Sequence, residues 1–178
     1  METNSLPHFD AILGPSSFGK PALTRYGDID LLTYAEADQV NCVSVGLADK
    51  PIKSVHPTEL VCTVLPGQEG AALHMLEVTI TAAVDGGFPL VLGSVLRNDS
   101  PLLARTGIHG ALLTTCLWRP QLDLLKDDDQ NILLHVIGVL PLTGPELLWI
   151  ADHGSDAFDG VIESATVDLM DATRPSAV

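Results

Sequence analysis

The stretch ILLHVIGVLPLTGPELLWIADHGSDAFDGVIE, residues 132–163, decides the fold of this chain. It begins with an almost uninterrupted apolar run from Ile132 to Leu140, which is too continuous for a strand with one face in water. We therefore expect a strand that is covered on both faces. We expect Pro141 to end this strand, because proline has no amide hydrogen to donate to a neighbouring strand.

The residues after Pro141 predict a helical hairpin. Thr143 followed three residues later by Glu146 is the pattern of a capping box, in which each side chain accepts a hydrogen bond from the other residue's backbone amide. The helix that begins here has an apolar side, made of Leu147, Leu148, Ile150 and Ala151. Gly154 stands where a helix often ends in a left-handed residue. Ser155 can cap a second helix, which contains Phe158, Val161 and Ile162.

The rest of the chain predicts further strands and one long helix. The expected strands are 28–34, 40–47, 59–65 and 111–118. The expected loops are 35–39, 50–57, 98–101 and 126–131. Within 68–84, apolar residues recur every three or four positions, which indicates a helix that Gly86-Gly87 ends. Residues 88–96 fit either a helix or a strand.

Length and composition describe one globular domain. The chain has 178 residues, of which 46% are hydrophobic and 18% charged, and no apolar run is long enough to cross a bilayer. Residues 1–14 lack the basic start and apolar core of a secretory signal, so we expect a cytoplasmic protein. Cys42, Cys62 and Cys116 are widely spaced inside apolar segments, which favours buried free thiols over disulfides or a zinc site.

Charge is the most informative part of the composition. The chain has 23 acidic and 9 basic residues, a formal net charge of −14. Nucleic acid and anionic membranes are poor partners for such a surface. The acidity serves either solubility alone or the steering of a basic protein partner. The candidate partner-binding residues are Asp127, Asp128, Asp129, Asp152, Asp156, Asp159 and Glu163, and each also fits a solvated face.

The sequence motifs indicate no catalytic, cofactor-binding or metal-binding residue. The six histidines lack the close pairing of metal sites, and His135 is expected to be a hydrogen-bonded core residue. Asp127-Asp128-Asp129 lacks the alternating spacing of a calcium loop. No nucleophile elbow or phosphate-binding loop is found. A catalytic site assembled from distant residues stays open.

Three motifs in order resemble the Suppressor of fused domain. They are VNCVSVGLADKP at 40–51, TELVCTVLPG at 58–67, and the strand and helical hairpin of 132–163. The positions that carry the resemblance are Pro66, Pro141, Glu146, Leu147 and Gly154. The resemblance spans residues 28–163. The aromatic-rich helix that the family has in the region of 86–110 is not found here.

The resemblance implies an α+β fold, a mixed β-sheet with helices packed on it that ends in a strand followed by a helical hairpin. The domain itself would cover residues 23–166. Residues 1–22 are expected to form a partly ordered N-terminal segment with one short helical turn and then a loop. Residues 167–178 are expected to form a flexible tail.

The resemblance also implies a protein-binding function. Bacterial single-domain members of the family are generally taken to be immunity proteins, which bind and silence a toxin domain encoded beside them. The partner would then be a basic protein, and a homodimer is also compatible. A small-molecule hydrolase of unknown type and a regulatory or assembly subunit are the alternatives. A deep pocket lined by histidines and carboxylates would favour the hydrolase.

Overall fold

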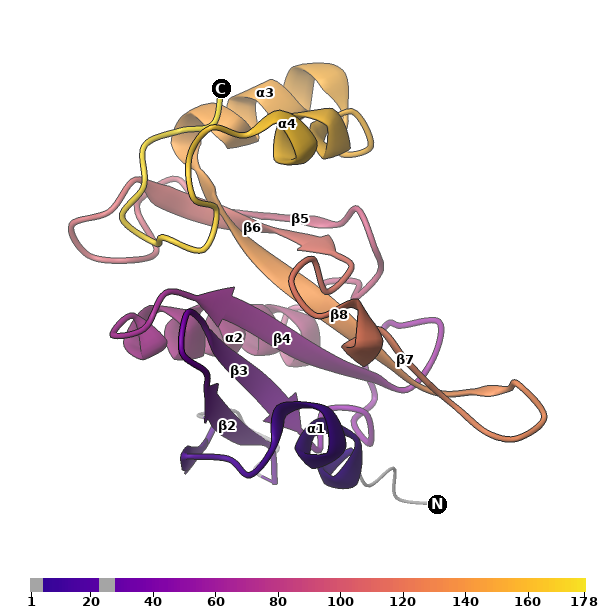
Figure 1. Cartoon of the computed structure of the whole chain (residues 1–178). Helices are drawn as coiled ribbons and strands as arrows, with labels where there is room; N and C mark the ends of the chain where they lie inside the picture. Colours follow the sequence, from indigo (N-terminus) through magenta and orange to yellow (C-terminus); the bar gives the residue numbers. More distant parts are fainter. Residues whose placement is uncertain (1–4, 23–27) are drawn as a thin grey trace.

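The computed structural model describes residues 5–22 and 28–178 (Figure 1). Eight strands in these residues form one sheet in the order β1-β2-β3-β4-β8-β6-β5, and β7 pairs with β8 outside this path. The strands are β1 Phe18–Pro21, β2 Asp30–Ala35, β3 Val40–Val45, β4 Thr58–Val64, β5 Val95–Arg97, β6 Ile108–Thr114, β7 Leu124–Lys126 and β8 Ile132–Thr143. The helices are α1 Leu6–Leu13, α2 Glu69–Val84, the 3-10 turn η1 Pro120–Leu122, α3 Gly144–His153 and α4 Phe158–Ser164.

The sheet is mixed, because β4 and β8 run parallel whereas the other pairs run antiparallel. Helices pack on it, and the last elements are a strand and a helical hairpin (Figure 1). The predicted α+β class is therefore confirmed. None of the helices among the described residues is long and apolar enough to cross a membrane.

Strand β8 runs through the middle of the molecule and contributes to all three hydrophobic clusters. Its side chains alternate between the two faces of the sheet. Ile137 and Val139 pack in the cluster that contains α2. Leu134 and Val136 pack in the cluster that contains Phe9 of α1. Leu140 and Leu142, which point to the same face as Leu134 and Val136, pack in the cluster that contains α3 and α4. The prediction of a strand covered on both faces is confirmed for the greater part of its length.

The prediction that Pro141 ends the strand is wrong, since β8 continues to Thr143 and Pro141 pairs with Ala111 of β6. Pairing with β4 stops at Gly138, so no strand needs the missing amide of Pro141. The carbonyl of Pro141 instead accepts a hydrogen bond of 3.0 Å from the guanidinium of Arg174. A proline is tolerated in a strand where one side of the ladder has already ended.

The helical hairpin follows the predicted pattern at its start and departs from it at its turn. Thr143 and Glu146 form the predicted capping box at the N-terminus of α3. Gly154 has the expected positive φ of 89°, but its ψ of 158° is extended and not left-handed helical. Ser155 does not cap α4 through its side chain; the N-cap is Ala157, and the amide of Phe158 donates to the Ser155 carbonyl oxygen.

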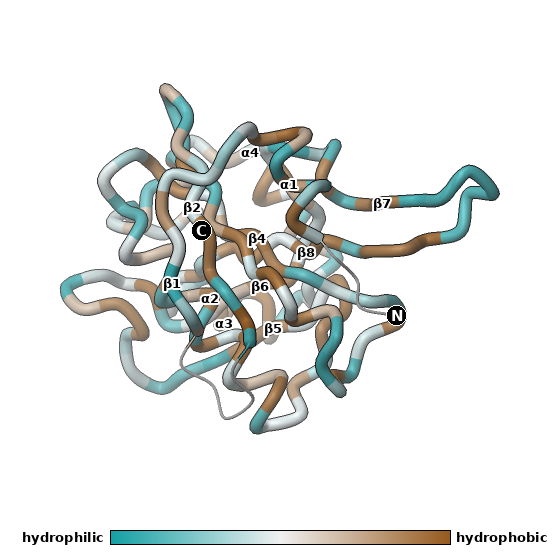
Figure 2. Tube along the Cα trace, turned by 90° about the horizontal axis from the view of Figure 1, so that it is seen from below, coloured by the Kyte–Doolittle hydropathy of each residue, from teal (hydrophilic) through white to brown (hydrophobic). Residues whose placement is uncertain are grey.

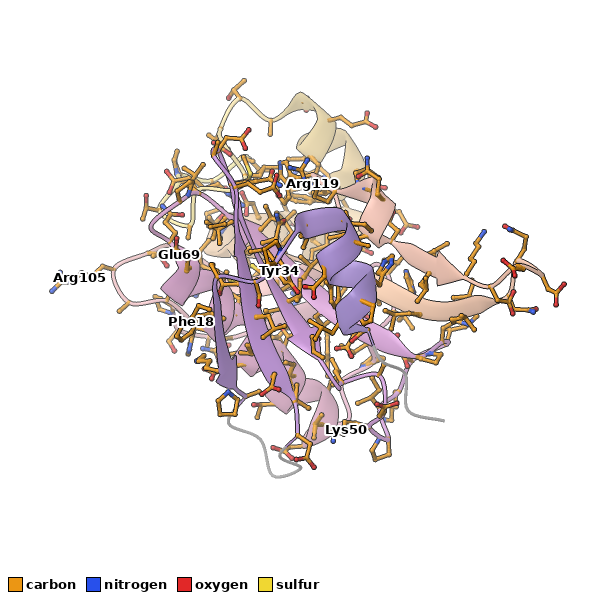
Figure 3. All side chains as sticks on the ribbon, turned by 60° about the horizontal axis from the view of Figure 1, so that its bottom comes forward. Phe18, Tyr34, Lys50, Glu69, Arg105 and Arg119 are labelled. Atoms are coloured by element: carbon orange, nitrogen blue, oxygen red, sulfur yellow. The ribbon has the colours of Figure 1, made fainter. Side chains whose placement is uncertain are left out.

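The N-terminal segment is more structured than predicted, although residues 1–4 lie outside the described residues. It contains the two-turn helix α1 and the edge strand β1. The Tyr34 hydroxyl on β2 donates a hydrogen bond of 2.8 Å to Asp10 Oδ1, and Figure 3 shows Tyr34 beside this helix. This contact attaches α1 to the sheet.

Two further differences concern short elements. Residues 88–96 are neither the helix nor the full strand that their pattern allows, because only β5 at their end is regular. The strand expected at 111–118 lies at Ile108–Thr114. Gly110 in this strand makes room for α3, since a Cβ atom there would meet Leu96 O at 2.1 Å and Leu147 Cδ1 at 3.1 Å.

The C-terminal residues 167–178 return to the body of the protein. Arg174 is 5% exposed, and the amide of Ala172 donates to Gln68 Oε1 at the start of α2. The flexibility of this segment stays a prediction, but its contacts place Arg174 in the core.

Candidate protein-binding surfaces

The C-terminal third of the chain concentrates negative charge. Between Lys126 and Arg174 the sequence contains no Lys or Arg. The acidic residues of this interval are Asp127, Asp128, Asp129, Glu146, Asp152, Asp156, Asp159, Glu163, Asp168 and Asp171. The sequence-predicted candidates fall at two separate places in the structure, the α3–α4 hairpin and the tip of the β7–β8 hairpin (Figure 1).

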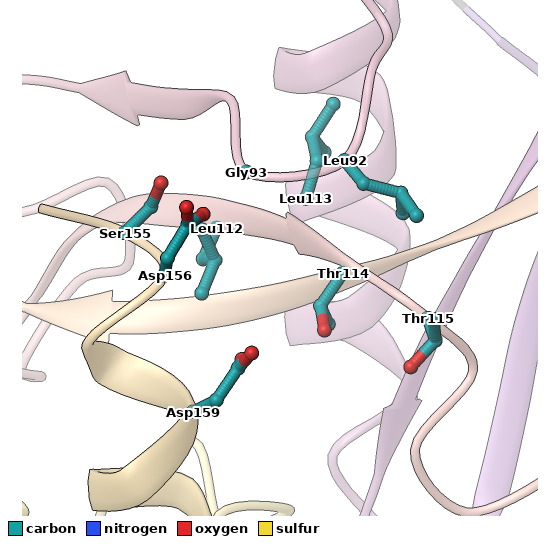
Figure 4. Close-up of a pocket in the computed structure, with 9 residues that line it drawn as sticks. All are labelled: Leu92, Gly93, Leu112, Leu113, Thr114, Thr115, Ser155, Asp156 and Asp159. Carbon is teal, nitrogen blue, oxygen red and sulfur yellow. The ribbon is translucent and has the colours of Figure 1, made fainter.

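The α3–α4 hairpin forms one wall of a cleft of about 180 Å³. Asp156 and Asp159 line it from the helical side, and Thr114 and Thr115 line it from the end of β6 (Figure 4). Buried Phe158 anchors α4 by packing edge-on against Trp149, with ring centroids 5.8 Å apart. None of the described residues that line the cleft is Lys or Arg, so the cleft can receive one cationic side chain from a partner.

The opposite wall of the cleft is held by backbone hydrogen bonds. The amide of Gly93 donates to Leu113 O at 2.8 Å, and the amide of Leu113 donates to Ser94 O at 2.9 Å. Asp152 and Glu163 are exposed on the same helical hairpin but do not line the cleft. The structure therefore brings Asp156 and Asp159 together and leaves the other two on the outer surface.

Asp127, Asp128 and Asp129 lie at the tip of the β7–β8 hairpin, which projects from the body (Figures 1 and 2). Asp127 has a structural role, because it accepts hydrogen bonds of 2.8 and 2.9 Å from the backbone and side-chain nitrogens of Asn131. These bonds lower the pKa of Asp127. Asp128 and Asp129 are exposed, so they are the carboxylates of this tip that a partner can meet.

The acidic loop at 35–39 is less available to a partner. Glu36 is paired with Arg119, whose Nε donates to Glu36 Oε1 at 3.1 Å, and Asn41 donates to the same oxygen at 2.8 Å. The charge of this loop is partly neutralised inside the protein.

Sequence reasoning did not single out Glu59, which is fully buried on β4. Its carboxylate accepts hydrogen bonds from the hydroxyls of Ser44 and Ser5 and from the amides of Gly46, Leu47 and Ala48. Burial raises its pKa to about 7, although these donors act in the opposite direction. Glu59 thereby joins β4 to the turn after β3 and to the residue before α1. A charged residue inside the apolar segment TELVCTV was the signal that could have found it.

The turn that holds Glu59 depends on a glycine. Gly46 has a φ of 96°, and a Cβ atom there would meet Asp28 O at 2.5 Å. A side chain would therefore be strained by both the backbone conformation and the contact. The motif VNCVSVGLADKP thus forms a strand followed by amides that point at a buried carboxylate.

Glu146 is a second buried carboxylate, and it has a cationic partner. Arg174 donates to both carboxylate oxygens, and the amides of Thr143 and Ala177 donate at 2.7 and 2.8 Å. Burial acts to raise the pKa of Glu146, but the hydrogen bonds from Arg174, Ala177 and Thr143 together hold it below its ordinary value. The capping box therefore also holds the C-terminal segment.

Asp123 interacts with both Cys116 and His135 near the start of β8. Asp123 accepts a hydrogen bond of 2.7 Å from the amide of Cys116 and interacts electrostatically with His135. Burial raises the pKa of the Cys116 thiol, and Asp123 raises it further, so this thiol stays protonated. His135 is half-buried and burial lowers its pKa. Among the residues that the structure describes, no three His, Cys, Asp or Glu gather as a metal site.

No family model matches the chain. The protein is similar to the immunity protein YqcF of Bacillus subtilis (strain 168), with 28% identity over 175 residues and 90% of each chain covered.

Solved structures of Suppressor of fused proteins share the fold. A putative homologue from Neisseria gonorrhoeae has a TM-score of 0.77 at 16% identity, with 99% of this chain and 96% of that chain covered. A chain of the Sufu–Fu complex has a TM-score of 0.64 at 11% identity, with 97% of this chain and 88% of that chain covered. The Drosophila protein has a TM-score of 0.61 at 12% identity, with 83% and 42% covered. The resemblance predicted from the three motifs is confirmed.

Proposed function

We propose that this protein is a bacterial immunity protein that binds and neutralises a basic toxin domain. The observation that carries the proposal is its likeness to the immunity protein YqcF along 90% of both chains, together with an acidic C-terminal third that lacks Lys and Arg from 127 to 173. A surface of one sign accelerates the encounter with a partner of the opposite sign. Neutralisation then requires only tight binding.

A cytoplasmic location belongs to the same proposal. The three cysteines are buried and free. Cys42 and Cys62 are direct neighbours on the paired strands β3 and β4, yet no disulfide joins them. Free thiols at such a spacing fit a reducing compartment.

The test is coexpression with the toxin domain encoded by the neighbouring gene of the host. The full chain should restore growth of cells that produce this domain, and the two proteins should elute together in gel filtration. An inactivated toxin domain serves as the purified partner. Restored growth without a complex would contradict neutralisation by binding, and failure of both readouts would contradict the immunity function.

A further inference from the structure

The β7–β8 hairpin has two faces of different character. In its register, Leu124 lies opposite His135 and Leu125 lies opposite Leu134. Because side chains alternate along a strand, Leu125 and Leu134 point to one face, and Leu124, Leu133 and His135 point to the other. Leu125 and Leu134 pack in the cluster that contains α1. We call the surface formed by Leu124, Leu133 and His135 the hairpin face.

Within residues 5–22 and 28–178, no other element covers the hairpin face. Leu124 and Leu133 are 39% and 41% exposed, and His135 is half-buried. Helix α2 covers the same side of the sheet further along β8, where Ile137 and Val139 pack against it. The hairpin extends beyond this helix, so its two leucines stay in contact with water.

A loop and an acidic tip border the hairpin. The amide of His135 donates a hydrogen bond of 2.8 Å to Pro57 O, so the end of the loop that carries Val55 lies next to β8. Val55 is 77% exposed. At the other end, residues 128–129 are exposed acids, with Lys126 as the neighbouring cation. Figure 2 shows the projecting hairpin with its hydrophobic β8 arm and hydrophilic tip.

We propose that the hairpin face, with its acidic tip, is the docking surface for the basic partner, through an apolar patch of that partner bordered by Lys or Arg. An apolar centre with a charged rim is the usual anatomy of a protein interface. The α3–α4 cleft has room for one side chain, whereas the hairpin presents separate apolar and charged contacts. The identity of the partner rests on the proposed function.

A second copy of this chain fits the hairpin face less well. Each copy has a formal charge of −14, so self-association through an acid-tipped hairpin is opposed by repulsion. Addition of a partner strand to the edge of β7 is also disfavoured, because β7 has three residues and ends in Lys126. The charge complementarity therefore favours a basic partner that covers the face.

The experiment measures binding of the full chain to the inactivated toxin domain by surface plasmon resonance. The double variant Leu124→Ser, Leu133→Ser should weaken binding by about tenfold or more, mainly through faster dissociation. The double variant Asp128→Lys, Asp129→Lys should slow association, and it keeps Asp127 in its structural role. Circular dichroism and thermal melting check that each variant is folded.

Matched controls lie on the helical hairpin. Leu148→Ser removes a leucine that is 69% exposed on α3, and Asp156→Lys with Asp159→Lys reverses the charge of the cleft. Leu148→Ser should bind as the wild type does. The cleft variant changes the net charge by as much as the tip variant does, so it should slow association less than the tip variant and leave dissociation unchanged. If the wild type binds and the hairpin variants bind equally well, or if only the cleft variant loses binding, the hairpin proposal is wrong while the immunity function stands.

Two further outcomes would also overturn the proposal. If the wild type fails to bind the toxin domain and fails to restore growth, the hairpin proposal falls with the immunity function. If the wild type forms a dimer in sedimentation equilibrium that Leu133→Ser abolishes, the hairpin face serves a second copy instead.

Discussion

At the scale of single residues, the two buried glutamates are stabilised by different kinds of partner. Glu146 is neutralised by Arg174, and the hydrogen bonds it receives hold its pKa below the ordinary value. Glu59 receives only neutral donors, and burial raises its pKa to about 7. A buried carboxylate that lacks a cation is protonated more readily in the folded protein than in the unfolded chain. The two residues should therefore give opposite contributions to the pH dependence of stability.

Glu59 should make the protein less stable as the pH rises. Its folded pKa of about 7 lies above the ordinary value of 4.5, so its contribution is fully present below pH 4.5 and is lost as the pH rises through 7. Relative to Glu59→Gln, wild-type stability should fall by about 3 kcal/mol across this window. Urea unfolding of both proteins at several pH values measures it. The comparison with Glu59→Gln is needed because both proteins contain His135. The pKa of His135 is lowered, so its contribution to stability is lost as the pH falls and would otherwise mask that of Glu59.

Glu163→Gln, which removes an exposed carboxylate, is the control for the loss of one glutamate. A constant difference in unfolding free energy between wild type and Glu59→Gln would show that Glu59 does not titrate in this range.

The three cysteines should be unreactive in the folded protein. Cys42 and Cys62 are fully buried and Cys116 is 4% exposed. Burial raises the pKa of Cys42 to about 11, so little thiolate forms near neutral pH. A disulfide reagent such as DTNB should label all three thiols in denaturant and none at a comparable rate in native buffer. Rapid labelling of the native protein would contradict this burial.

At the scale of elements, the start of α3 should matter more to stability than a capping box alone. Thr143→Ala should cost about 0.5–2 kcal/mol, as loss of a cap does. Glu146→Ala also leaves Arg174 buried without its partner, so it should cost about 3–5 kcal/mol. Denaturant unfolding of both variants measures the two costs.

A double-mutant cycle separates the ion pair from the cap. Glu146→Ala combined with Arg174→Ala should cost less than the sum of the single changes, because the double variant leaves no unpaired charge. Additive costs would show that the pair does not couple. Thr143→Ala combined with Arg174→Ala is the comparison, since Thr143 is not the charged partner of Arg174.

The sequence predicts long elements well because their patterns repeat. The apolar run of β8, the period of α2 and the capping box of α3 each rest on several residues. Strand β7 has three residues, too few to show alternation, and it exists because β8 offers it a partner. The passage of β8 through Pro141 depends on where β4 stops pairing. Pairing between strands that are distant in the sequence produces no pattern in the local sequence.

The candidate site was predictable only in part for the same reason. The acidic character of the surface follows from composition, and the sequence predicts the acids of the cleft and of the tip as candidate partner-binding residues. Which of them share a surface depends on the turn between α3 and α4 and on the projection of β7 and β8. Leu124 and Leu133 are exposed because the β7–β8 hairpin extends beyond the part of the sheet that α2 covers. An apolar strand that is partly uncovered has the same sequence pattern as one that is fully covered.

At the scale of the whole molecule, the net charge of −14 should govern the rate of association with a basic partner. Opposite charges on two proteins accelerate their approach. At physiological ionic strength, salt screens charges that are more than about 8 Å apart. Association with the inactivated toxin domain should therefore slow steeply as salt rises, while dissociation changes little. Stopped-flow or surface plasmon resonance measurements at several salt concentrations test this. Leu124→Ser with Leu133→Ser should keep the wild-type salt dependence, because it changes no charge. An association rate that is flat between low and physiological salt, or a partner that is acidic, would refute electrostatic steering.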